Sequence, residues 1–187
     1  MLVASSADRA RAQDATHGAL TTIELAKCKR VDQGAAEGNA WSCAGLPGYP
    51  VHLAEVDDRT FLSFGRNAEQ RRASRQTLSA PNTLFPSASK RATIEWRVPA
   101  AATGAKGEAA VPYATIVRYT TARGVKRGQV LVVSKVTPSE ACQVALIDAD
   151  ANADAAALAR KIADTTARTF DCAKPPQVHG ATGKAPM

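Results

Sequence analysis

The sequence is poor in aromatic residues, which make up 5% of its 187 positions. It has no run of the roughly 18 to 20 apolar residues that a membrane-spanning helix needs, so no transmembrane segment is predicted. It also lacks a glycine-rich phosphate loop and a dinucleotide-binding fingerprint, so no cofactor is predicted. The length fits one domain with a modest core. We expect that core to form around the larger apolar residues, which are Trp41, Phe61, Phe64, Trp96, Tyr119 and Phe170.

Four cysteines, Cys28, Cys43, Cys142 and Cys172, are spread along the chain. None of them belongs to a C-x-x-C motif, which argues against a zinc ribbon and a thioredoxin-like redox site. Of the three pairings that four cysteines permit, Cys28–Cys43 with Cys142–Cys172 closes the shortest loops and is the predicted one. In the chain-entropy model these bonds stabilise the fold by about 3 and 3.5 kcal/mol. Paired cysteines indicate an oxidising compartment, and four buried free thiols are the alternative.

The two ends of the chain are predicted to lie outside the folded domain. Residues 1–18 are predicted to be unstructured or the remnant of a signal peptide. Ala10-Arg11-Ala12 resembles a cleavage site, although the apolar segment that precedes such sites is missing. Residues 173–187 contain two adjacent prolines and two glycines, a composition typical of a disordered tail. A single globular domain is therefore predicted over residues 19–172.

Alternating apolar and polar residues predict several strands. Residues 51–56 and 59–64 flank Asp57-Asp58, which predicts a β-hairpin with a two-residue turn. Residues 129–137 are apolar on both faces, which predicts a central strand. Residues 21–31 fit either a strand or a short helix. Further strands are predicted over residues 94–98, 114–121 and 142–147.

A helix is predicted over residues 152–170. Asn152 is its predicted N-cap, Asp154 complements the helix dipole, and an apolar stripe follows at helical spacing. A second, short helix is predicted over residues 67–76, with Asn67 as its N-cap. The predicted fold class is thus α+β: a mostly antiparallel sheet with the C-terminal helix packed on it, one short additional helix, and two disulfides.

Motifs spread over residues 21–172 carry a family resemblance. They are Thr22-Ile23-Glu24-Leu25-x-x-Cys28, Trp41-x-Cys43-x-Gly45-x-x-Gly48-Tyr49-Pro50-Val51, Asp58-Arg59, Ser63-Phe64-Gly65, Gln76-Thr77-Leu78, Asn82-Thr83-Leu84 and Ile94-Glu95-Trp96-Arg97. This pattern resembles a family of small exported bacterial proteins of unassigned function. The resemblance implies an oxidising compartment and the cysteine pairing given above, and it implies no activity.

Positive charge is concentrated in one segment. The formal net charge is +7, and residues 59–97 hold eight cationic and two acidic side chains, a net of +6. On the predicted short helix, Arg71 and Arg75 lie one turn apart on one face, with Arg72 beside them. Guanidinium groups suit carboxylates and phosphates, so these three arginines are the predicted binding site for an acidic protein or polymer. The alternative is a solvated face whose arginines pair with carboxylates from elsewhere in the chain. Residues 66–75 contain no aromatic residue on which bases could stack, so specific nucleic-acid binding is not predicted.

Two other groups of residues resemble sites of known chemistry. Residues 148–154 match the first ligands of a calcium loop, but Ala153 and Ala159 replace the glycine and glutamate that such loops require. No metal site is therefore predicted. His52 is the histidine that falls within a predicted strand, where a packed residue is commoner than a catalyst, so no catalytic residue is predicted.

The sequence therefore predicts a non-enzymatic exported binding or interaction module of the bacterial envelope, periplasmic or secreted. A small hydrolase that acts on an envelope component is the alternative, and a cytosolic nucleic-acid binder comes third. The first predicts a surface without a deep polar cleft. The hydrolase requires a pocket that holds His52 or two carboxylates within hydrogen-bonding distance. The sequence does not specify the ligand or the oligomeric state.

Overall fold

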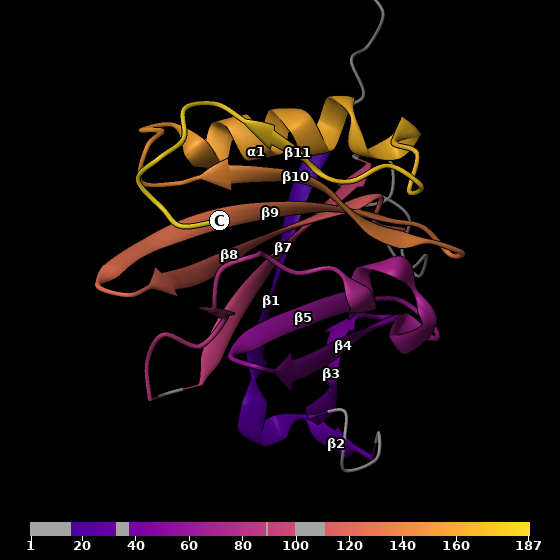
Figure 1. The fold of residues 1–187 in the computed structure, drawn as a ribbon. Coiled ribbons are helices and arrows are strands. Elements are labelled where there is room, and N and C mark those ends of the chain that lie inside the picture. The colour runs from indigo at the N-terminus through magenta and orange to yellow at the C-terminus, as the bar shows by residue number, and fades with distance from the viewer. Residues whose placement is uncertain (1–15, 33–37, 89, 100–110) are drawn as a thin grey trace, which may run out of the picture.

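The computed structural model describes residues 16–32, 38–88, 90–99 and 111–187, which form two β-sheets and one α-helix (Figure 1). The larger sheet has the strand order β1-β7-β8-β9-β10-β11, with β6 paired to β8. Its neighbouring strands are antiparallel, except that β10 and β11 are parallel. The strands are β1 (Thr16–Glu24), β6 (Asn82–Thr83), β7 (Arg91–Pro99), β8 (Ala114–Arg123), β9 (Lys126–Val136), β10 (Ala141–Asp148) and β11 (Gln177–His179).

The smaller sheet has the order β2-β3-β4-β5, and all of its pairs are antiparallel. Its strands are β2 (Lys29–Val31), β3 (Asn39–Leu46), β4 (Tyr49–Val56) and β5 (Arg59–Phe64), and a 3-10 turn η1 (Leu25–Lys27) joins β1 to β2. The predicted hairpin is confirmed, because β4 and β5 pair along their length. Its turn residues Asp57 and Asp58 have φ of 48° and 58°, as a type I′ turn requires.

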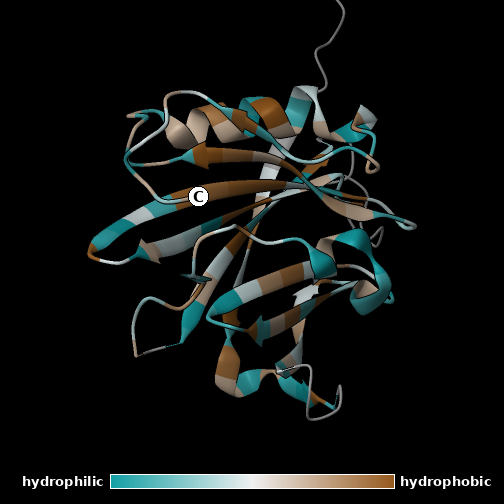
Figure 2. Cartoon of the chain, in the orientation of Figure 1, coloured by the Kyte–Doolittle hydropathy of each residue, from teal (hydrophilic) through white to brown (hydrophobic). Residues whose placement is uncertain are grey.

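Strand β9 separates two apolar cores. Val130 and Val132 belong to the core between the two sheets, whereas Leu131 and Val133 belong to the core beneath the helix. This alternation explains why the strand is apolar on both faces, since successive side chains of a strand point to opposite sides of the sheet. Figure 2 shows the resulting hydrophobic band along β9 and β10. In the first core, the fully buried Trp96 ring meets Phe64 edge-on, with centroids 5.5 Å apart.

The C-terminal helix α1 (Ala155–Thr165) packs on the larger sheet, as predicted (Figure 1). It is shorter than the predicted span of 152–170 at both ends. Asn152 does not cap it: the side-chain Nδ2 donates to the carbonyl oxygens of Asp148 and Ala181, each at 2.8 Å. After the helix the chain continues as a 3-10 turn, η5 (Ala167–Thr169). Competing side-chain hydrogen bonds therefore set the start of the helix.

The short helix predicted over residues 67–76 is wrong. Two 3-10 turns, η2 (Ala68–Gln70) and η3 (Arg72–Arg75), replace it. Arg71 lies between them in an extended conformation, with φ −77° and ψ 156°, which breaks any continuous helix. The protein is consequently richer in strand than the predicted α+β fold, with 49% of its described residues in strands.

The C-terminal segment, predicted as a disordered tail over residues 173–187, instead packs on the domain. Its residues 177–179 form β11, a parallel edge strand of the larger sheet. Ala185 is buried in the core between the sheets, at 4% exposure. Composition suggested disorder, but backbone hydrogen bonds to β10 and to one buried carboxylate hold the segment in place.

The predicted unstructured N-terminus also needs correction. Strand β1 begins at Thr16, so residues 16–18 belong to the larger sheet, while residues 1–15 lie outside the described residues. Gly18 passes close to the side chains of Glu95 and Arg97: a Cβ atom there would lie 3.2 Å and 3.3 Å from them. Strand β1 therefore passes directly beside both charged side chains.

Both predicted disulfides are confirmed. Cys28 pairs with Cys43 and Cys142 pairs with Cys172, which leaves no free cysteine. The second bond ties β10 to the segment that follows η5. Two disulfides fit an oxidising environment such as that of exported proteins. Among the described residues, no helix is long and apolar enough to cross a membrane.

Candidate functional site

The predicted arginine site divides into one anchored and two exposed side chains. Arg71 is half-buried, and its guanidinium donates to backbone carbonyls on both sides of it. Nη2 reaches the carbonyls of Arg66 at 3.1 Å and Pro138 at 3.0 Å, and Nη1 donates to that of Ser139. These bonds join the η2–η3 segment to the turn between β9 and β10. The Arg71 guanidinium therefore fixes the backbone of the η2–η3 segment. Arg71 and Arg75 do not share an exposed helix face as predicted.

The remaining arginines of this segment form what we call the arginine surface: Arg66, Arg72 and Arg75. All three are exposed. Among the described residues, no hydrogen bond or ion pair engages their guanidinium groups. Two residues stabilise the 3-10 turns that carry these arginines. Ala73 is buried, and the Ser74 hydroxyl donates to the Glu69 and Arg71 carbonyls. The segment thus presents three unpaired cations on a fixed backbone.

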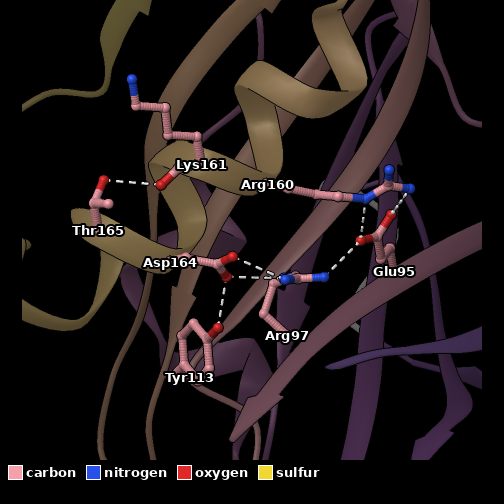
Figure 3. Close-up of polar contacts among 7 residues, drawn as sticks. All are labelled: Glu95, Arg97, Tyr113, Arg160, Lys161, Asp164 and Thr165. Carbon is pink, nitrogen blue, oxygen red and sulfur yellow. Dashed lines mark hydrogen bonds and ion pairs between the residues drawn. The ribbon is translucent and has the colours of Figure 1, made fainter. Parts of the chain in front are cut away.

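A second group of charged residues, which the sequence did not single out, links α1 to the larger sheet (Figure 3). Arg97 on β7 is 6% exposed and donates twice to Asp164 on α1, from Nε at 2.9 Å and from Nη2 at 2.8 Å. The Tyr113 hydroxyl donates to the same carboxylate at 2.6 Å. Glu95 bridges Arg97 and the exposed Arg160, accepting at 3.1 Å and 2.8 Å.

The electrostatics of this network follow from its burial. Burial disfavours the charge on Arg97, but the hydrogen bonds and charge of Asp164 outweigh that effect and raise the pKa of Arg97. Burial and the hydrogen bond to Asp164 raise the pKa of the Tyr113 phenol, which therefore stays protonated at neutral pH. The guanidinium carbon of Arg168 lies 4.0 Å from the centre of the Tyr113 ring. The Arg97 guanidinium and the Tyr113 hydroxyl both donate to carboxylates, so the network stabilises the packing of α1 on the larger sheet.

Sequence reasoning missed this network because the residues that α1 contacts are 51 to 67 positions away from it along the chain. One signal was available: Glu95 and Arg97 alternate on a strand, so both face the same side of the sheet. That pattern does not reveal which helix supplies the partner, since the pairing depends on how α1 crosses β7.

His52, the residue that a hydrolase would need, lies on β4 and is 6% exposed. It borders a hollow of only about 90 Å³, together with Glu69 and Asn67. Ligand pockets usually measure about 300 to 1,000 Å³, so this hollow offers no room for a substrate. Burial lowers the pKa of His52, and the nearby charge of Glu69 opposes the shift only in part. The position is that of a packed residue.

This lowered pKa predicts a pH-dependent stability. A depressed folded-state pKa means that the unfolded chain binds the proton more tightly, so the contribution is complete above pH 6.5 and is lost as the pH falls below it. We expect the free energy of unfolding of the wild type to fall between pH 7.5 and pH 5.5 more steeply than that of His52→Gln. Urea denaturation at the two pH values measures both slopes. Equal slopes would contradict the prediction.

The acidic run at residues 148–154 has a structural use. Asp148 is fully buried, and its carboxylate accepts four backbone N–H groups. Asp150 and Ala151 donate to Oδ1 at 3.1 Å and 3.0 Å, and Lys184 and Ala185 donate to Oδ2 at 2.8 Å each. The carboxylate thereby fastens the C-terminal segment to β10. In the described part of the chain, no three His, Cys, Asp or Glu side chains are placed to hold a metal.

A cleft of about 580 Å³ lies between the β4–β5 turn and the end of the β8–β9 hairpin. The sequence did not predict it. Glu55, Asp57 and Asp58 line it on the turn side, and Arg127 lines it from β9. Its volume falls within the range of small-molecule sites.

Comparison with family models, with characterised proteins and with solved structures finds no match to this chain. The resemblance to small exported bacterial proteins therefore stays a prediction, and any function has to be argued from the residues themselves.

Proposed function

We propose that this chain is a non-enzymatic binding module of the bacterial envelope, periplasmic or secreted, which binds an acidic protein or polymer. The observation that carries the proposal is the arginine surface: Arg66, Arg72 and Arg75 are exposed and unpaired among the described residues. Guanidinium groups bind carboxylates, sulfates and phosphates through paired hydrogen bonds. Because the groups have no internal partner, they are available to an acidic surface.

The backbone beneath this surface is held in place, which favours binding. Arg71 fixes it to the β9–β10 turn through the carbonyls of Pro138 and Ser139. A site whose backbone is already ordered loses less conformational entropy on binding. Arg71, which the sequence groups with the binding residues, makes contacts that support a positioning role.

The compartment is part of the same proposal. Both disulfides fit an oxidising environment, of which the periplasm and the exterior are the bacterial examples. Cationic modules in such a compartment meet acidic polymers and acidic protein surfaces, and long-range attraction raises their association rates.

The hydrolase alternative is less well supported. It needs a histidine or a carboxylate pair beside a substrate pocket, and His52 is buried away from the 580 Å³ cleft. The cleft does contain three carboxylates, but Asp57 and Asp58 are exposed on a turn. A general acid of the glycosidase type depends on apolar surroundings that keep it protonated. These two aspartates lack such surroundings.

The arginine surface predicts salt-sensitive binding to heparin, a sulfated polymer used as the probe. We expect the Arg72→Gln/Arg75→Gln double variant to elute from immobilised heparin at a clearly lower salt concentration than the wild type, because two of three exposed cations are lost. Its free energy of unfolding should change by no more than about 0.5 kcal/mol, as is usual for exposed side chains. Elution gradients and urea denaturation provide the two readouts.

The matched control is Arg118→Gln/Lys161→Gln, which removes the same charge from exposed positions on β8 and α1. An equal shift in this control would mean that net charge alone governs retention, and the proposed surface would be rejected. Arg71→Gln should instead lower the urea midpoint, because it breaks the hydrogen bonds to the β9–β10 turn.

A further inference from the structure

The cleft beside the β4–β5 turn has walls of opposite charge. Glu55, Asp57 and Asp58 belong to the β4–β5 hairpin, while Arg127 belongs to β9 on the other side. None of the four makes an ion pair or a side-chain hydrogen bond within the described residues. Charges of opposite sign that face one cleft without pairing leave space for a ligand that carries both signs.

The fifth charged residue of the cleft, Arg59, already makes a hydrogen bond within the protein. Arg59 donates from Nη2 to the Ser79 carbonyl at 3.1 Å. With Arg59 counted, the lining has three carboxylates and two guanidinium groups, a formal charge of −1. This local excess of negative charge is unusual in a chain of net charge +7. A ligand of net charge +1 that also carries one carboxylate would match it.

The base of the cleft is fixed by buried hydrogen bonds. The Asn82 side chain accepts from the Thr60 N–H at 3.1 Å and donates to the Ala80 carbonyl at 2.9 Å. The Asn82 N–H donates to the Asp58 carbonyl at 2.8 Å, which joins the base to the acidic turn. The cleft is therefore formed before any ligand arrives, which reduces the entropic cost of binding.

A buried polar atom also lies at this site. Thr121, which lines the cleft from β8, is fully buried, and its hydroxyl has no hydrogen-bond partner among the described residues. A buried hydroxyl without a partner costs about 1 to 3 kcal/mol. Apolar surface is present as well, since Phe85 and Val56 contribute to the lining. The cleft thus combines two charged ends, an unsatisfied hydroxyl and an apolar wall.

We infer that this cleft binds a basic amino acid, free or within a short peptide, that carries two ammonium groups and one carboxylate. Arg127 holds the ligand carboxylate, because a guanidinium pairs with a carboxylate through two parallel hydrogen bonds. The acidic residues Glu55, Asp57 and Asp58 hold the ammonium groups, and the aliphatic stem of the ligand lies along the apolar wall. This site is separate from the arginine surface and from its acidic partner.

Isothermal titration calorimetry with four probes tests the inference. L-lysine carries all three charges, cadaverine lacks the carboxylate, L-norleucine lacks the second ammonium, and L-lysyl-L-alanine offers the same charges in a peptide. We expect lysine to bind at least about tenfold more tightly than cadaverine or norleucine, since a hydrogen-bonded charge contributes about 1.5 to 3 kcal/mol. If the dipeptide binds more tightly than lysine, the ligand is a peptide. If lysine binds more tightly, the ligand is a free amino acid.

Two variants test which residues bind the carboxylate and which bind the ammonium groups of the ligand. Arg127→Gln should weaken lysine binding about tenfold and leave cadaverine within a factor of about two, because only lysine has the carboxylate. Asp57→Asn/Asp58→Asn should weaken both ligands about tenfold. Asparagine tolerates the positive φ of both turn positions, so the hairpin is retained. Lys161→Gln, on α1, which contributes no residue to the cleft lining, should change neither affinity.

Two results would overturn the inference. One is the absence of measurable heat from both lysine and the dipeptide at about 10 mM, a concentration at which even a millimolar site would be occupied. The other is an equal loss of lysine and cadaverine binding in Arg127→Gln. Neither result bears on the heparin experiment, so failure of this site leaves the proposed function standing.

Discussion

Replacing Asp164 by alanine is expected to lower the free energy of unfolding by about 3 kcal/mol, the low end of the range found when a buried ion pair loses one partner, because Asp164 itself is half-buried. The carboxylate accepts two hydrogen bonds from Arg97 and one from the Tyr113 hydroxyl. Its removal leaves a guanidinium that is 6% exposed with its charge only partly compensated by Glu95. Urea denaturation at neutral pH measures the loss.

The matched control is the double variant Arg97→Met/Asp164→Leu, which replaces the pair by apolar side chains. It should recover most of the lost stability, because the cost of an unpaired buried charge disappears with the charge. A single Asp164→Ala loss below about 1 kcal/mol would show that water reaches Arg97 and that the network does not tie α1 to the sheet. Glu95→Gln provides an intermediate case, since Glu95 also contacts the exposed Arg160.

Asp148→Ala is expected to lower the free energy of unfolding by about 3 kcal/mol. Four backbone N–H groups lose their acceptor, and each buried donor left without one costs about 1 to 3 kcal/mol. The expected loss is smaller than the sum of the four costs. The C-terminal segment can detach, so that water hydrates its two N–H donors. Trypsin cleavage after Lys184 should therefore become faster than in the wild type, and urea denaturation gives the stability.

Asp150→Ala is the control for this second prediction, because Asp150 accepts the single backbone N–H of Gln129 at 2.8 Å. Its expected cost is about 1 kcal/mol, the usual net value of one hydrogen bond. If the two variants were equally stable and equally resistant to trypsin, the buried carboxylate would not be what fastens the C-terminal segment.

Together these experiments separate the structural charges from those available for binding. Arg97 and Asp148 are buried, Asp164 is half-buried, and all three are engaged in hydrogen bonds, so changes to them should act on stability. Arg72 and Arg75 are exposed and unpaired among the described residues, so changes to them should act on binding and leave stability nearly unchanged. Residue type and net charge do not distinguish the structural charges from the binding charges, whereas burial and hydrogen bonding do.

The sequence by itself determined the features that depend on local pattern. Asp57-Asp58 between two extended runs specified the hairpin, because few residues tolerate a type I′ turn. The contiguous valines and leucine of residues 130–133 specified a strand buried on both faces, and β9 is that strand. Cysteine spacing gave the correct pairing, since short loops close most easily. The stripe formed by Ala155, Leu158, Ala159, Ile162 and Thr166 specified α1, although not its ends.

Only the tertiary structure decided the features that depend on distant partners. The segment 67–76 has helix-forming residues, yet Arg71 is extended because its hydrogen bonds reach carbonyls 67 and 68 positions away. The C-terminal segment has the composition of a disordered tail, yet Asp148 supplies acceptors for two of its N–H groups. The cleft and the Arg97–Asp164 pair likewise join strands and a helix far apart in the chain. Local propensities amount to less than 1 kcal/mol per residue, so several hydrogen bonds to charged groups override them.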